Sequence, residues 1–128
     1  MRARVEAIQM NEDLKDYRKS VVKYIALLAS ASEQVRYERE VPIADVPAEL
    51  VSCFCDDLFH PKHDLFLGAF TEQELKSLAE LYSMLCIASK AANKQDCHRV
   101  AELQKIPEWR SVMAFAQDLV DELNKAAD

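Results

Sequence analysis

Residues 107–123 read PEWRSVMAFAQDLVDEL, which is the clearest amphipathic pattern in the chain. Apolar side chains recur three and four residues apart from Trp109 to Leu123, as on one face of an α-helix. Pro107 suits the first turn of such a helix, because its fixed φ is helical and the amide hydrogen that it lacks would have no partner there. A helix from Pro107 onward is therefore predicted. Trp109 could serve as an interface anchor, but its place on the stripe favours the core.

A second helix start lies at residues 71–74, which read TEQE. This is a capping box, in which the Thr71 hydroxyl accepts from the amide of Glu74 and the Glu74 carboxylate accepts from the amide of Thr71. The apolar stripe that follows predicts a helix that ends near Asn93.

The remaining helices are predicted from weaker signals. Apolar residues at helical spacing indicate a first helix over residues 11–30, with residues 1–10 either extending it or frayed. A charged segment over residues 32–42 is either a short helix or a continuation of the first. Pro47 can open another helix that stops before Pro61, and Asp96 can cap a short one that ends near Lys105.

These elements predict an all-α fold, a bundle of about five helices that forms a single domain over residues 1–128. Residues 41–47 are predicted to be a loop because prolines lie close to both ends. Residues 60–70 are predicted to be a second loop. The chain has one glycine, Gly68, where average usage gives about nine, so a glycine-rich phosphate loop is not expected.

The chain carries no signal for membrane or export. It contains no run of 18 apolar residues, and no apolar segment follows the charged N-terminus. These features predict a cytoplasmic protein without a membrane partner. The four cysteines are then expected to be reduced thiols.

The negative charge is concentrated in the middle of the chain. The formal net charge is −6, and residues 41–80 hold two Lys/Arg against eight Asp/Glu. This balance opposes binding to nucleic acid, which needs cations, and favours encounter with a basic partner. The same carboxylates also fit a plain solvated face with helix capping.

The densest set of possible metal ligands is Cys53, Cys55, His60 and His63. Zinc sites use such residues in fours, but two cysteines that are two residues apart point about 200° apart on a helix. Half-buried thiols and loop histidines fit the pattern better, so neither a metal nor another cofactor is expected.

No catalytic motif is found. The carboxylate pairs at residues 56–57 and 121–122 do not point the same way on a helix, so neither is preset for acid–base catalysis. Cys97 and His98 are adjacent in the sequence, but a catalytic cysteine needs its base close in space. The chain is therefore expected not to be an enzyme. Phe59, Phe66 and Phe70 flank the predicted loop, where they either pack it onto the core or form the apolar centre of a binding patch.

Three segments together resemble a known family. Residues 57–61 read DLFHP, residues 69–75 read AFTEQEL and residues 107–113 read PEWRSVM. Their order is similar to that in small helical immunity proteins of bacterial contact-dependent growth inhibition and related polymorphic toxin systems. The resemblance covers about residues 50–123. It implies a non-enzymatic inhibitor that binds a cognate toxin domain made by the same cell, and many such toxins are nucleases with basic clefts.

The leading functional hypothesis is therefore an immunity-type inhibitor of a basic toxin, with a monomer favoured. The alternative is a helical homodimeric structural or adaptor protein, and a DNA-binding regulator ranks last because the basic side of the first helix also holds carboxylates. The predicted partner-binding residues follow from charge and loop placement, and they are Glu49, Asp56, Asp57, His60, His63, Asp64, Phe66, Glu72 and Glu80.

Overall fold

The structure is a computed structural model that describes residues 2–41 and 45–127, with side chains over 11–41 and 45–125. Within these ranges all regular structure is helical, which confirms the all-α prediction. There are more helices than the five or so predicted, because several are short. They are α1 (Arg2–Ala29), α2 (Ala31–Glu40), α3 (Val46–Ser52), the π-helix η1 (Cys53–Leu58), α4 (Asp64–Ala69), α5 (Glu72–Lys94), α6 (Val100–Leu103) and α7 (Pro107–Ala127).

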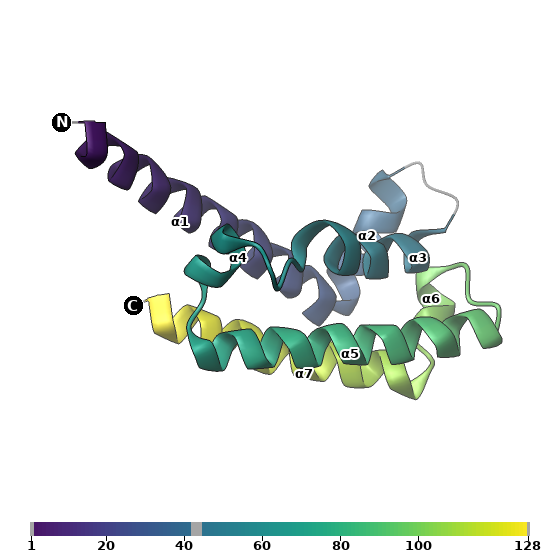
Figure 1. The fold of residues 1–128 in the computed structure, drawn as a ribbon. Helices are drawn as coiled ribbons and strands as arrows, with labels where there is room; N and C mark the ends of the chain where they lie inside the picture. Colours follow the sequence, from purple (N-terminus) through teal and green to yellow (C-terminus); the bar gives the residue numbers. More distant parts are fainter. Residues whose placement is uncertain (1, 42–44, 128) are drawn as a thin grey trace.

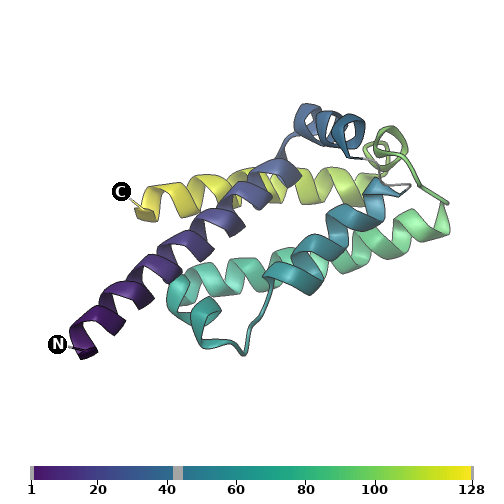
Figure 2. The same ribbon diagram turned by 90° about the horizontal axis from the view of Figure 1, so that it is seen from above.

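Three long helices form the body of the molecule (Figure 1). α5 and α7 run side by side in opposite directions, and α1 packs against α7. The N-terminal turns of α1 project beyond the other helices in both views (Figure 2). The α3–η1 segment lies along α5, α4 packs on α1, and α2 lies beside α6. None of the helices in the described ranges is long and apolar enough to cross a membrane.

The apolar stripes meet in one cluster of buried side chains. Trp109 is fully buried there, so the predicted core position is confirmed. Its indole N–H donates to the Gln34 side-chain oxygen at 3.0 Å. Gln34 is also fully buried, and its amide nitrogen donates to the carbonyls of Leu27 and Leu28 near the end of α1. Helix ends leave carbonyls without partners, and Gln34 satisfies two of them while it fixes the tryptophan.

A second buried polar contact joins four helices. The Arg18 guanidinium on α1 donates to both carboxylate oxygens of Glu74 on α5, each at 2.8 Å. It also donates to the backbone carbonyls of Ala69 in α4 at 3.0 Å and Leu123 in α7 at 2.9 Å. Glu74 still completes the capping box with Thr71, as predicted. We name this contact the Arg18–Glu74 anchor.

Several boundaries follow the predictions. α7 begins at Pro107, α5 ends one residue beyond Asn93, and the backbone over residues 2–10 extends the first helix. The charged segment is a separate helix, because Ser30 adopts an extended conformation that ends α1, and its side chain caps α2. Asp45 caps α3, which starts at Val46, so the predicted 41–47 loop is shorter than expected. Residues 42–44 of that loop lie outside the described ranges.

Two boundary predictions were wrong. Residues 60–70 are not all loop, because residues 64–69 form α4, with Phe66 and Ala69 buried and the His63 side chain accepting from the amide of Leu65. Asp96 does not open a helix, because it adopts a positive φ of 58° after the end of α5. α6 starts later, where Glu102 accepts from the amide of Arg99.

Candidate functional site

The exposed acidic surface of the middle segment lies on η1, the following loop and the start of α4. The carboxylates of Asp56, Asp57 and Asp64 are exposed, and they form no hydrogen bond or ion pair with the described residues. His60 and His63 lie between them and are also exposed, together with Lys62. We call residues 56–64 the acidic segment. Five of the nine predicted partner-binding residues are therefore brought together on one short, exposed stretch of chain.

The two histidines of the acidic segment have local structural roles. A ring nitrogen of His60 bonds the backbone carbonyl of Asp57 at 2.7 Å, and His63 caps α4. The two rings lie 6.5 Å apart between centroids. Among the side chains that the structure describes, no three His, Cys, Asp or Glu residues are grouped to hold a metal ion.

The prediction that Phe66 lies on the binding surface is wrong, because the residue is buried. Only 1 % of this residue is exposed, because α4 folds back and buries its apolar side. The ring packs edge-on against Tyr17 and Phe59, and it also contacts Phe70. Of the two roles considered for these aromatics, packing onto the core is the one that the structure supports for Phe66 and Phe70, which are both buried.

The remaining three predicted residues lie on α3 and α5, outside the acidic segment. Glu49 is half-buried on α3 and accepts from the Cys53 thiol at 3.1 Å. Glu72 and Glu80 are exposed on α5. Tyr82 lies on the side of α5 that contacts Phe59, and a residue two positions away on a helix points about 200° from it. Glu80 therefore faces away from η1 and cannot share a compact patch with Asp56.

Two other carboxylates of the acidic third are committed to the fold. Glu74 is in the Arg18–Glu74 anchor, and hydrogen bonds from Arg18 lower its pKa in spite of burial. Asp45 caps α3 and also bonds His98 at 2.9 Å. Burial would raise the pKa of Asp45, but the hydrogen bonds from His98 and from the amide of Ala48 outweigh it and lower the value. Fewer carboxylates are thus free to contact a partner than the sequence count of eight indicates.

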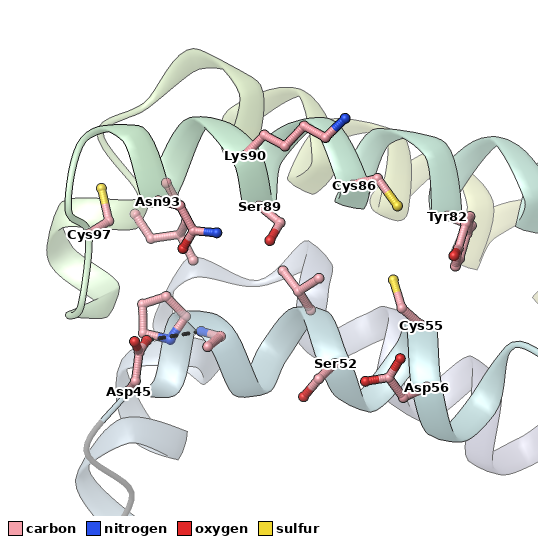
Figure 3. A pocket seen from close by; sticks show the side chains of 15 residues that line it. Asp45, Ser52, Cys55, Asp56, Tyr82, Cys86, Ser89, Lys90, Asn93 and Cys97 are labelled. Atoms are coloured by element: carbon pink, nitrogen blue, oxygen red, sulfur yellow. Dashed lines mark hydrogen bonds between the residues drawn. The ribbon is translucent and has the colours of Figure 1, made fainter.

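A cleft of about 440 Å³ lies between the α3–η1 segment and α5 (Figure 3). Asp45, at the start of α3, and Cys97 line one end of it, whereas Cys55, Asp56 and Tyr82 line the other. The Asp56 side chain therefore belongs to both the acidic segment and the cleft. Ser52 and Ser89 add polar atoms between these ends.

Two thiols face each other in this cleft. Figure 3 shows the sulfur of Cys55, on η1, pointing toward that of Cys86, on α5. Burial raises the pKa of the Cys55 thiol to about 12, with further contributions from the charges of Cys86 and Asp56. Cys53 faces Glu49 and Tyr24 instead, and burial followed by the Glu49 hydrogen bond raises its pKa to about 11.

Sequence reasoning placed Cys53 and Cys55 in one candidate cluster with the loop histidines, and it missed the pairing with Cys86. The only available signal was the divergence of side chains two positions apart on a helix. That argument separates Cys53 from Cys55, but it cannot identify which residue lies opposite either of them. The π-helix adds to the difficulty, because its hydrogen bonds run from residue i to i+5, as between Phe54 and Phe59.

No known protein family, characterised protein or solved structure matches this chain.

Proposed function

We propose that this chain is an immunity-type inhibitor, a single helical-bundle domain that binds and neutralises a cognate basic toxin domain, such as a nuclease, in the bacterial cytoplasm. In this proposal the acidic segment is the binding surface, and the chain catalyses no reaction. Neither nucleic acid nor membrane is a partner.

The observation that carries the proposal is the state of the carboxylates in the acidic segment. The carboxylates of Asp56, Asp57 and Asp64 are exposed and form no hydrogen bond within the part of the chain that the structure describes, unlike those of Asp45 and Glu74. An exposed cluster of one sign of charge raises the rate of encounter with a partner of the opposite sign. The toxin surface expected to meet it is rich in Lys and Arg.

The surroundings of the acidic segment support a protein partner. Phe59 is half-buried between Phe54 and Tyr82, which stacks on it at 4.8 Å between ring centroids. Phe59 is next to His60 and two residues from Asp57 along the chain. Interfaces commonly combine aromatic groups with a polar rim, and the segment offers both.

The experiment that tests the proposal is capture of partners on the tagged protein at low salt, with mass spectrometry of what is retained. Screening weakens contacts between exposed charges, with a Debye length of about 10 Å at 0.1 M salt. We expect a basic protein that is retained at low salt and eluted at high salt.

A pair of matched triple variants locates the surface. Asp56→Lys, Asp57→Lys and Asp64→Lys together should abolish retention of that protein. The control reverses three exposed carboxylates elsewhere, Glu12→Lys, Asp16→Lys and Asp118→Lys, with the same change in net charge.

Equal loss of retention in the two triple variants would mean that net charge, rather than this surface, drives binding. Capture of the bait alone, with light scattering that gives the mass of a dimer, would support the homodimeric structural protein instead.

A further inference from the structure

We propose that Cys55 and Cys86 form a thiol modification site, which low-molecular-weight disulfides convert to an internal cross-link between η1 and α5. The inference does not depend on the proposed function. It requires only the reduced protein and an oxidant of that chemical class.

Three observations place the two thiols in position to react. Both line the same cleft, which is open to solvent over part of its wall. Their sulfurs point toward each other from elements that are distant in the sequence (Figure 3). Each thiol is half-buried, so a small disulfide can reach the cleft while water is partly excluded from it. A single cysteine on a helix face would lack the opposing thiol.

The other two cysteines are poor competitors for the cross-link. Cys53 is two residues from Cys55, but its thiol donates to Glu49 on the opposite side of the segment. Cys97 is buried, and it lines the far end of the cleft, near Asp45. The fold therefore selects one pairing among those that four cysteines allow.

The chemistry balances in two exchange steps. The Cys86 sulfur attacks a disulfide RSSR, which forms a Cys86–SR bond and releases the first RS⁻. The Cys55 sulfur then attacks Cys86, which forms the Cys55–Cys86 bond and releases the second RS⁻. The two thiol protons leave with these anions as two RSH, so the cysteines are oxidised while RSSR is reduced.

The electrostatics of the cleft favour this order of steps. A Cys55 thiol with a pKa of about 12 stays protonated at neutral pH, so it is a poor first nucleophile. Burial is the main cause of that raised pKa, and the charge of Cys86 adds to it. A mixed disulfide on Cys86 carries no thiolate charge, so the first step removes the smaller of these two contributions.

Treatment of the reduced, full-length protein with oxidised glutathione tests the proposal. We expect a product lighter by two hydrogens, and a non-reducing peptide map that joins the Cys55 peptide to the Cys86 peptide. Dithiothreitol should restore the original mass. The cross-link also closes the chain between η1 and α5, so we expect the melting temperature to rise by roughly 5 °C or more.

Variants and a denatured control distinguish a cross-link directed by the fold from random pairing of the cysteines. Cys53→Ser should cross-link as the wild type does, whereas Cys55→Ser should stop at a single glutathione adduct on Cys86. Cys55→Ala serves if the serine variant is unfolded. In denaturant the selectivity should disappear, with Cys53–Cys55 links and mixed adducts appearing.

A native product linked through Cys53 or Cys97 would overturn the proposal. A wild-type protein that accumulates adducts without an internal link would do the same.

Discussion

Near its N-terminus α5 presents Glu74 to the Arg18 guanidinium, and about three turns later it presents Cys86 to an open cleft. At the first place a bidentate ion pair is surrounded by backbone carbonyls from α4 and α7. At the second, a thiol from η1 meets a thiol from α5, with serines and an aspartate nearby. The buried polar groups of the anchor are hydrogen-bonded, whereas the two thiols of the cleft are half-buried and line its open wall. The same helix thus holds a hydrogen-bonded ion pair at its start and a half-buried thiol further along.

Among the polar side chains, removal of Arg18 should have the largest effect on stability. Arg18→Met leaves the Glu74 carboxylate buried without its cation, and breaking such a pair should lower the free energy of unfolding by about 3 kcal/mol. Urea unfolding followed by circular dichroism measures the change. The matched control is Lys19→Met, because Lys19 is the next residue and is exposed, and it should cost less than about 0.5 kcal/mol. Equal losses in the two variants would refute the anchor.

Neutralisation of Glu74 should have a smaller effect, and one that depends on pH. Glu74→Gln keeps the capping geometry but weakens two charge-assisted hydrogen bonds, for a loss of about 2 kcal/mol at neutral pH. Because the pKa of Glu74 is lowered by folding, its stabilisation is present above the ordinary value of about 4.3 and is lost as pH falls through the lowered value.

The unfolding free energies of wild type and Glu74→Gln should therefore converge in acid. Exposed Glu80→Gln is the control and should show neither the loss nor the convergence. A gap between wild type and Glu74→Gln that persists unchanged in acid would contradict the assigned role of the carboxylate.

Substitutions in the cleft should be better tolerated than those at the anchor. Cys86→Ala in the reduced protein removes one half-buried thiol that makes no structural hydrogen bond of the kind seen in the anchor, so the loss should stay below about 1 kcal/mol. Phe54 is next to Cys55 but is fully buried, so it serves as the comparison. Phe54→Ala should lower the free energy of unfolding by about 3 kcal/mol. Thermal unfolding of the reduced variants measures both. If Cys86→Ala lowered the free energy of unfolding as much as Phe54→Ala, Cys86 would instead have a structural role in the core.

The smallest effect is expected at His98, whose ring bridges Asp45, which lines the cleft, and Asp96. Its ring nitrogens bond Asp45 and Asp96, and the hydrogen bond to Asp45 followed by that to Asp96 raises the pKa of His98 above its ordinary value of about 6.5. A raised pKa gives stability that is complete below the ordinary value and is lost as pH rises through the folded value. His98→Gln should remove this slope from the stability of the protein above pH 6.5. Asp45→Asn, which retains an N-cap, should reduce the slope, because the hydrogen bond to Asp96 remains. The test is a series of melting temperatures across that range, in which an unchanged slope for both variants would rule out the bridge.

Short-range patterns predicted the long helices well. Thr71 and Glu74 lie three residues apart and contact each other directly, so their sequence spacing was sufficient. Pro107 and the stripe behind it behaved in the same way. The short helix α4 was missed because Pro61 and Gly68 suggested a loop, although Asp64, Leu65 and Phe66 between them suit a helix start.

Long-range contacts could not be predicted in this way. Periodicity places Arg18 and Glu74 on helix faces, but their contact depends on how α1 crosses α5 and α7. The pairing of Cys55 with Cys86 likewise depends on the extra residue per turn in η1 and on the path of α4. Charge counting overestimates the number of free carboxylates for a related reason, because Glu74 pairs with Arg18 and Asp45 with His98, and these partners are far apart in the sequence.

Trp109 is the only tryptophan of the chain, and its indole N–H is held by Gln34 from another helix. The protein therefore carries a single tryptophan, which can be excited apart from the four tyrosines and whose emission reports one defined contact. In the folded state the buried ring should emit at short wavelength, and detachment of α2 from α7 should shift the emission to the red. An optical signal that requires no label is thus available for titrating a partner or following oxidation in real time.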